Sequence, residues 1–361
     1  MSNLPQNQYA PDEVSPPGET LAETLKAIGI TQKELAARSG RPIKTINEII
    51  KGKTAITFDT ALQFERVLGI SASFWNNRER HYQEALARKR EVKRLQEGVE
   101  WLKRTPIRAM VRLGWVRRFK NRVLQMQELL NFFGIASPEQ YPKAVEGQVA
   151  YRKPAAFSSN PDALAAWLRK GQIEVQRIIC APYDRAKFQE ALKKIRALTP
   201  QAPEAFVPEM TRLCSECGVA VVFVPELPGT RAHGATRWLG SAKALIQLSL
   251  RYKSDDQLWF SFFHEAGHIL LHGKQDVFVE GAGGDPVKEK QANRFAERWL
   301  IPEDQLQLFM HSGQRSIRAI EGFAREMGIA PGIIVGRLQH EGHLPRNHCN
   351  HLKRSLEWTS T

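Results

Sequence analysis

Two histidines four residues apart, with a glutamate directly after the first, form the pattern in this chain that is best suited to chemistry. They are His264, Glu265 and His268. On a helix, side chains four residues apart lie on one face, so both imidazoles can bind one Zn²⁺. Glu265 comes from the same turn and could act as general base on a water molecule at the metal. The spacing therefore predicts a helix that carries a hydrolytic zinc site.

A catalytic zinc takes three protein ligands, so a third must come from another element. Glu289 offers a carboxylate from the next expected helix, where Ala292 and Ala296 are small enough to let the two helices approach. Asn293, one turn beyond Glu289, could hold a ligand by a hydrogen bond. We therefore expect the two histidines and this glutamate to hold the zinc ion.

Amide hydrolysis also needs a group that stabilises the negative charge developing on the scissile carbonyl. His233 and Arg231 are candidates, because they lie at the start of an expected strand. Both could equally be ordinary surface or strand-end residues. The two histidines of the zinc pattern likewise have alternatives: they could be packed helical side chains, or they could bind a metal without catalysing a reaction.

Longer stretches around these residues resemble the ImmA/IrrE family of metallopeptidases. They are residues 263–272 and 289–296, followed by Leu-Ile-Pro at 300–302. The resemblance covers about residues 205–340. It implies a zincin-like domain, a gluzincin-like endopeptidase in which the two histidines and Glu289 hold zinc and Glu265 is the base. It also implies protein substrates, such as DNA-binding repressors.

Residues 31–51 have the pattern of a helix-turn-helix. Thr31 with Glu34 three residues later is a capping-box signature, Gly40 ends that helix, and Pro42 suits the first turn of the next. The second helix of such a motif enters the major groove, while helix ends and nearby cations contact phosphates. The predicted DNA-binding residues are Gln32, Lys33, Arg41, Lys44, Thr45, Asn47, Lys51 and Lys53.

Residues 52–57 and 68–75 extend this pattern, and about residues 19–90 resemble the HigA-type antitoxin branch of the Cro/repressor helix-turn-helix family. The resemblance implies a homodimer on a palindromic operator of double-stranded DNA, autoregulation, and binding of a toxin encoded by a neighbouring gene. Pro42 and Ile43 stand where small polar residues are usual. The base contacts therefore stay open.

The net charge of +14 favours an anionic partner such as nucleic acid. Thirteen of the 52 lysines and arginines lie in residues 88–122, against three acidic residues. This segment could follow phosphates, or it could be the solvated face of a helical connector. Four cysteines in 361 residues do not suggest a disulfide framework and fit a reducing cytoplasm. No long apolar stretch or signal-peptide pattern is present, so we expect no membrane contact.

The patterns together predict an α+β chain that is mostly helical. Apolar, β-branched or alternating runs predict strands at 218–224, 232–239 and 243–250. The expected domains are a flexible tail at 1–18, an all-α helix-turn-helix domain at 19–90, a helical connector at 91–204, a zinc metallopeptidase core with a small sheet at 205–310, and a helical pair with a tail at 311–361.

Three functions fit these expectations. The first is a DNA-binding, antitoxin-like regulator coupled to a zinc endopeptidase that cleaves a partner protein, either a repressor or a toxin. The second is a non-catalytic antitoxin-repressor whose metallopeptidase-like domain senses or clamps a partner. The third is a peptidase whose helix-turn-helix recognises only its protein substrate.

Overall fold

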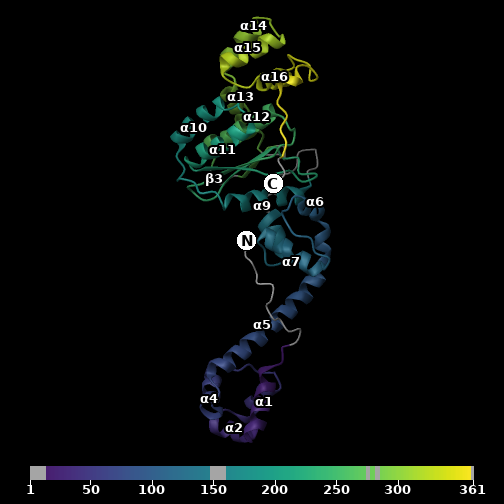
Figure 1. Ribbon diagram of the computed structural model, residues 1–361, viewed down its shortest axis with the longest axis vertical. Coiled ribbons are helices and arrows are strands. Elements are labelled where there is room, and N and C mark those ends of the chain that lie inside the picture. The colour runs from purple at the N-terminus through teal and green to yellow at the C-terminus, as the bar shows by residue number, and fades with distance from the viewer. Residues whose placement is uncertain (1–13, 147–159, 274–276, 281–284, 359–361) are drawn as a thin grey trace. The chain divides into compact units, whose positions relative to one another are not determined.

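The computed structural model describes residues 14–146, 160–273, 277–280 and 285–358, and the chain divides into two compact units, Met1–Gly98 and Val99–Thr361. The described elements are mostly helices, with a small sheet in the second unit (Figure 1). This confirms the predicted fold class. The boundary between the two units in the sequence falls within the predicted connector of 91–204. The finer domain boundaries stay predictions. Among the helices described, none is long and apolar enough to cross a membrane.

The described helices of the first unit pack around one apolar core. Serine or threonine side chains cap the starts of α2, α4 and α5, and left-handed glycines follow α1, α2 and α4. Leu21, Leu35, Ile46, Phe64 and Trp75 are fully buried at the centre. The helices are α1 (Pro17–Ile28), α2 (Gln32–Ser39), α3 (Ile43–Ile50), α4 (Phe58–Leu68) and α5 (Ala72–Glu97).

A close backbone contact between α1 and α3 lies at the start of the first helix. The predicted tail spans residues 1–18, of which 1–13 lie outside the described residues, while α1 already begins at Pro17. A Cβ atom at Gly18 would lie 2.1 Å from the carbonyl oxygen of Ile49. Glycine thus lets the two backbones touch, and the helix starts inside the segment expected to be tail.

A four-stranded sheet in the order β1-β3-β2-β4 lies at the centre of the second unit. β1 pairs in parallel with β3, and β2 runs antiparallel to both β3 and β4. The three predicted strands are present, and β4 adds an edge that the sequence does not reveal, because three residues are too few to show alternation. The strands are β1 (Val219–Phe223), β2 (Gly234–Trp238), β3 (Ala244–Leu248) and β4 (Val277–Val279).

Helices cover both faces of this sheet (Figure 1). α9 (Pro161–Val175) lies on one face, and α11 (Pro203–Ser215) and α12 (Asp255–Leu271) lie on the other. Successive strand side chains, such as those of Val221 and Val222, enter opposite apolar clusters, as the two-residue period of a strand requires. Both faces of the sheet are therefore buried.

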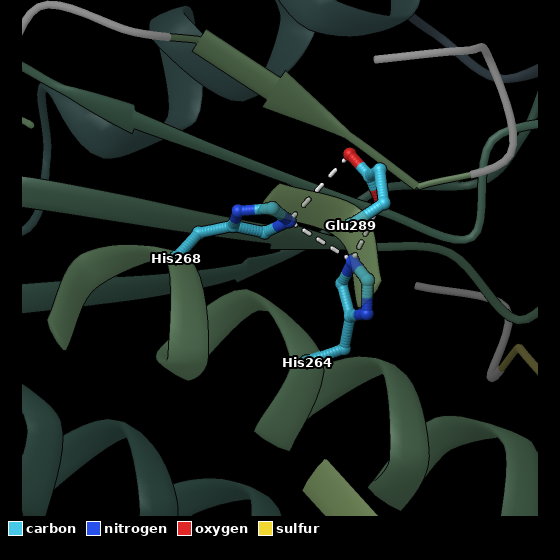
Figure 2. Close-up of side chains that lie close together, drawn as sticks. All are labelled: His264, His268 and Glu289. Atoms are coloured by element: carbon cyan, nitrogen blue, oxygen red, sulfur yellow. Dashed lines mark hydrogen bonds and ion pairs between the residues drawn. The ribbon is translucent and has the colours of Figure 1, made fainter. Parts of the chain in front are cut away.

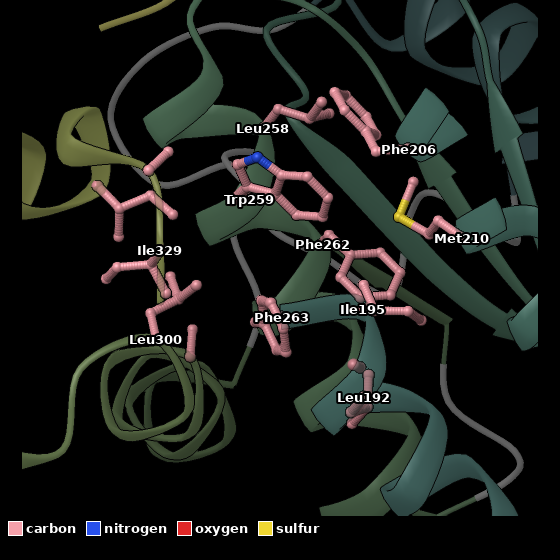
Figure 3. Packing of buried hydrophobic residues seen from close by; sticks show 14 of the residues in the cluster. Leu192, Ile195, Phe206, Met210, Leu258, Trp259, Phe262, Phe263, Leu300 and Ile329 are labelled. Carbon is pink, nitrogen blue, oxygen red and sulfur yellow. The ribbon is translucent and has the colours of Figure 1, made fainter. Parts of the chain in front are cut away.

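The helix α12, which carries the zinc pattern, is enclosed by the larger of these clusters. Figure 3 shows Trp259, Phe262 and Phe263 of α12 packed against side chains such as Phe206 and Leu300 from neighbouring helices. All three aromatic residues are fully buried. Such dense packing fixes the rotation of α12 about its axis, and with it the direction in which the histidines point.

The other described helices complete the second unit. The sequence predicts a helix from Pro286 to Pro302 and a helical pair at 316–327 and 331–341, and these correspond to α13, α15 and α16. The loop that it predicts around Gly281, Gly283 and Gly284 lies outside the described residues. These helices are α6 (Ile107–Arg112), α7 (Arg122–Phe133), α10 (Arg185–Ala197), α13 (Pro286–Leu300), α14 (Glu303–His311), α15 (Ile317–Met327) and α16 (Pro331–His340). Short helical turns are η1 (Val99–Lys103), η2 (Pro138–Gln140), η3 (Pro142–Glu146) and η4 (Asn350–Leu352).

The chain beyond α16 returns to the start of α12. Leu356 donates its backbone N–H to the Lys253 oxygen at 2.8 Å, and Asp255 donates to the Arg354 oxygen at 3.0 Å. Leu356 is buried in the larger cluster. Part of the predicted C-terminal tail is thus held against the start of α12. Its partners lie about one hundred positions away in the sequence, so no local pattern reveals this contact.

Candidate metal centre

Helix α12 carries His264, Glu265 and His268 on a stretch that is buried from Leu258 onward almost without interruption, and the three side chains are 0–1% exposed. The adjoining α13 approaches closely at Gly267, where a Cβ atom would lie 3.1 Å from the ring of Phe295. The small, fully buried residues on the facing side of α13 allow this approach, as the sequence predicts.

The predicted ligands converge in one place (Figure 2). Nε2 of His264 lies 3.2 Å from Oε2 of Glu289 and 3.0 Å from Nε2 of His268. Nε2 of His268 lies 3.7 Å from Oε1 of Glu289. In the described part of the chain, this is the group of three such side chains whose ligand atoms lie within 4.8 Å of one another.

These residues fit a zinc ion. Two imidazoles and one carboxylate are a usual donor set for catalytic zinc. Oε1 of Glu289 and both carboxylate oxygens of Glu265 are buried without a hydrogen-bond partner in the structure. Buried carboxylate oxygens are costly unless something satisfies them, and a cation bound between His264, His268 and Glu289 would do so for Oε1 of Glu289.

Asn293 holds the first histidine. Nδ1 of His264 donates to Oδ1 of Asn293 at 2.8 Å. Nδ1 therefore carries a hydrogen atom, so Nε2, which faces Glu289, is the atom that would bind a metal in place of a proton. The second histidine is held from the sheet side, because the Phe278 ring of β4 stacks on His268 with 4.0 Å between ring centres.

Without a metal, the two histidines share one proton. Burial lowers the pKa of both imidazoles, but the Glu289 carboxylate and the nearby Glu280 and Glu265 outweigh it for His264 and raise its pKa to about 9. For His268 burial prevails and the pKa falls to about 4. Burial would also raise the pKa of Glu289, but the two histidines beside its carboxylate lower it to about 2. A metal ion would take the place of the shared proton.

Glu265 lies on the side of α12 that faces the sheet. Burial is the main cause that raises its pKa to about 8, while the charge of His264 opposes it. Thr236 of β2 donates its hydroxyl to the main-chain oxygen of Glu265 at 3.1 Å. A carboxyl group with a raised pKa can exchange a proton near neutral pH, which suits a general base.

The structure adds Glu280, which the sequence did not single out. Its carboxylate lies 3.6 Å from Nδ1 of His233 (Oε1 to Nδ1). Burial would raise the pKa of Glu280, but hydrogen bonding to His233 and the charge of His264 lower it. A single glutamate after a three-residue strand carries no sequence signal, because its place beside the site depends on strand pairing.

A cavity of about 940 Å³ opens beside the metal ligands. His264, Glu289, Asn293, His233 and Glu280 are among the residues that line it. Residues of α16 and of the C-terminal segment, including Arg337 and Lys353, line it as well. His233 thus lies where a substrate carbonyl could sit, whereas Arg231 is exposed and is not among the residues described as lining the cavity.

The predicted DNA-binding residues lie on and around α2 and α3. Lys33, Lys44, Asn47, Lys51 and Lys53 are exposed, and the Lys44 side chain is 84% exposed. Lys44 and Asn47 are three residues apart on α3 and so share one face. The remaining predicted DNA-binding residues, Gln32, Arg41 and Thr45, are half-buried. Nε of Arg41 donates to Oε1 of Gln63 at 2.6 Å.

Comparison with known protein families assigns both regions. A helix-turn-helix model matches residues 21–75, and a peptidase family model described as the IrrE N-terminal-like domain matches residues 216–339. The chain carries a helix-turn-helix domain and an IrrE N-terminal-like domain. This confirms the two family resemblances that the sequence suggests. No curated protein matches the chain significantly.

Two solved structures match about a quarter of this chain. One is an addiction module antidote protein of the HigA family from Coxiella burnetii, with 30% identity, 24% of this chain and 94% of that chain covered, and a TM-score of 0.22. The other is described as an antidote protein of a plasmid maintenance system from Nostoc punctiforme, with 26% identity, 23% and 91% coverage, and a TM-score of 0.23.

The two ranges matched by family models contain different sites of the chain. The IrrE N-terminal-like domain runs from β1 to the penultimate residue of α16 and so contains every residue of the candidate metal centre. The helix-turn-helix domain contains all eight predicted DNA-binding residues, whereas the basic segment 88–122 lies outside both ranges. The cavity wall formed by Lys353 and its neighbours follows the IrrE N-terminal-like domain in sequence.

Proposed function

We propose that this chain is a DNA-binding regulator whose IrrE N-terminal-like domain is a zinc-dependent endopeptidase acting on a partner protein, either a repressor or a toxin. The observation that supports it best is the convergence of His264, His268 and Glu289 beside the buried Glu265, next to a cavity. The cavity is large enough to take several side chains of an extended peptide segment.

Each residue has a task in this proposal. His264, His268 and Glu289 would hold zinc, which when bound polarises a carbonyl oxygen and makes water a stronger acid. Glu265 would accept the proton of the attacking water and pass it to the leaving nitrogen. His233 would donate a hydrogen bond to the oxygen of the scissile carbonyl, and Glu280 would hold the Nδ1 side of its ring.

The helix-turn-helix domain would place Lys44 and Asn47 of α3 against base edges of a double-stranded operator. Asparagine suits adenine, and lysine suits guanine or a phosphate. Lysines at the ends of the motif, such as Lys33 and Lys53, would contact phosphates. A homodimer on a palindromic site would give two such contacts one helical turn apart.

One observation favours a second function. Glu265 is fully buried against β2 and is not among the residues described as lining the cavity. If Glu265 cannot reach a bound substrate, it cannot act as a base. The domain would then bind a metal and would clamp or sense a partner, such as a toxin, without cleaving it. The chain would then be an antitoxin-repressor.

The first experiment is elemental analysis of purified wild type, Glu289→Ala and the control Glu326→Ala, which removes an exposed acid from α15. We expect about one zinc per chain in the wild type and the control, and none in Glu289→Ala. Wild type without zinc would overturn the metal centre.

The second experiment separates the two functions. Wild type and Glu265→Gln, both loaded with zinc, are incubated with a peptide library made from a bacterial proteome, and new peptide termini are identified by mass spectrometry. Cleavage by wild type alone supports the endopeptidase. Zinc binding without cleavage in either protein supports the clamp.

A further inference from the structure

The second zinc-binding histidine is followed by a chain of hydrogen bonds that leads to the surface. His272 lies one turn after His268, and the two Nδ1 atoms are 2.9 Å apart. On the far side of the His272 ring, Nε2 lies 2.9 Å from Oε1 of Gln291 on α13. Three side chains from two helices are thus joined in series, from a fully buried ligand to an exposed amide.

Only one of the two facing Nδ1 atoms can carry the hydrogen atom of the bond between them. If His268 carries it, Nε2 of neutral His268 has a free lone pair that points at His264 and Glu289. If His272 carries it, neutral His268 must hold its hydrogen atom on Nε2, where the metal would bind. The direction of this single hydrogen bond therefore decides whether His268 can be a ligand.

Gln291 selects that direction. In the orientation that the structure gives the Gln291 amide, Oε1 faces His272, and an amide oxygen can only accept, so Nε2 of His272 is the donor and carries the hydrogen atom. Nδ1 of neutral His272 is then an acceptor and receives the hydrogen atom of His268. An amide at the surface thus determines the tautomer of a buried histidine through one intervening ring.

We propose that His272 and Gln291 are positioning residues that fix His268 in its ligand-competent tautomer and so raise the affinity of the centre for zinc. The proposal rests on the proposed zinc site. In this proposal α13 supplies Glu289 and also orients both histidines. Asn293 holds His264 directly, and Gln291 holds His268 through His272. Partners that orient metal-binding histidines are generally worth about 10–100-fold in metal affinity.

The hydrogen bonds that run from Gln291 through His272 to His268 form a relay. One substitution at the surface can reverse the direction of its hydrogen bonds. Gln291→Lys offers only donors, so it favours the wrong tautomer of His272 and hence of His268. Gln291→Glu offers only acceptors and keeps the right one. Val287→Lys is the control for the added charge, because Val287 is exposed one turn earlier on the same face of α13.

The measurement is the zinc dissociation constant of the full chain, obtained by competition with a chromogenic chelator. We expect Gln291→Lys to bind zinc about 10–100-fold more weakly than wild type, and Gln291→Glu to bind at least as tightly. Val287→Lys should stay within about threefold of wild type, because exposed charges are screened. Equal affinity in Gln291→Lys and Val287→Lys would overturn the relay.

A second pair of variants tests the intervening ring. His272→Leu removes the acceptor and should weaken zinc binding by a similar factor, whereas His272→Gln supplies an amide oxygen in its place and should restore part of it. The visible spectrum of the Co²⁺-loaded protein reports whether His268 still binds the metal in each variant. If wild type itself binds neither zinc nor cobalt, the proposed metal centre fails; if wild type binds and both variants match it, only the relay fails.

Discussion

The backbone of Gly234 touches the side chain of Glu265. A Cβ atom built at position 234 would lie 2.7 Å from Oε1 and 2.8 Å from Cγ of Glu265. The first residue of β2 therefore has no side chain at the place where the proposed base is held. Because Glu265 is fully buried, it has little room to move aside.

Gly234→Ala should displace the proposed base without touching the ligands. Overpacking of this kind costs about 1–3 kcal/mol of folding stability. A catalytic group that moves by about 1 Å can cost on the order of 100-fold in rate. We expect peptide cleavage to fall by at least about tenfold while the zinc content stays at the wild-type level.

Gly322→Ala is the matched control, because nothing lies within 4 Å of a Cβ atom at this helical position of α15. It should be neutral or slightly stabilising, since alanine favours helix over glycine. Unchanged cleavage by Gly234→Ala would mean that the exact place of the Glu265 carboxylate does not matter, and would count against its role as base.

Asn293 provides a second test of the centre. Asn293→Leu removes the acceptor for Nδ1 of His264 and should weaken zinc binding by about 10–100-fold. Asn293→Asp keeps an acceptor and should bind close to wild type. Arg294→Gln, at the exposed neighbouring position, is the control. Chelator competition gives the affinities, and identical values for the leucine and aspartate variants would contradict this role.

Local patterns were enough to predict three side chains that lie together, but not their surroundings. His264 and His268 are four residues apart on one helix, so helical geometry alone brings them together. Glu289 could be singled out because it lies on the next helix, whose small residues Ala292 and Ala296 permit close packing. The positions of all three relative to one another follow from a single helix pair.

Glu280 and Gln291 were missed for a physical reason. Glu280 reaches His233 because β4 pairs with β2, and a three-residue strand leaves almost no periodicity to detect. Gln291 acts through the ring of His272, a contact between two helices that depends on side-chain direction. Interactions of this kind are set by tertiary packing, which a single sequence does not specify position by position.

Asp255, at the start of α12, predicts a dependence of stability on pH. Burial raises its pKa from 3.8 to about 6, although backbone N–H groups of Arg354 and Asp256 bond to its Oδ1 atom and oppose the shift. The folded chain thus holds this proton more tightly than the unfolded chain. The stabilising contribution is full below about pH 4 and is lost as the pH rises through about 6.

Asp255→Asn should remove this dependence, because the amide oxygen can still accept both backbone hydrogen bonds and carries no charge. Relative to wild type, the variant should gain on the order of 2 kcal/mol in free energy of unfolding between about pH 4 and pH 7. Urea unfolding at these two values measures it. Asp304→Asn, at the exposed first turn of α14, should show no such gain. A constant difference between Asp255→Asn and wild type across this range would contradict the shift.

The exposed face of α3 provides the last prediction. Lys44→Ala and Asn47→Ala remove side chains that make few contacts within the chain, so the folded helix-turn-helix domain should melt as wild type does. The probe is a DNA duplex enriched from a random library by the wild-type protein. Each substitution should weaken binding by about 1–3 kcal/mol, as expected for loss of a base contact, and Asn47→Ala should also relax the preferred sequence.

Lys26→Ala, which removes an exposed lysine from the last turn of α1, is the control and should bind the duplex as wild type does. Binding should weaken steeply with salt if residues 88–122 also contact phosphates, and a shallow slope would remove that segment from the contact surface. Failure of the wild type to enrich any duplex would mean that the helix-turn-helix contacts a protein instead. That result would leave the proposed metal centre untouched, because its residues lie in the second unit and the helix-turn-helix residues lie in the first.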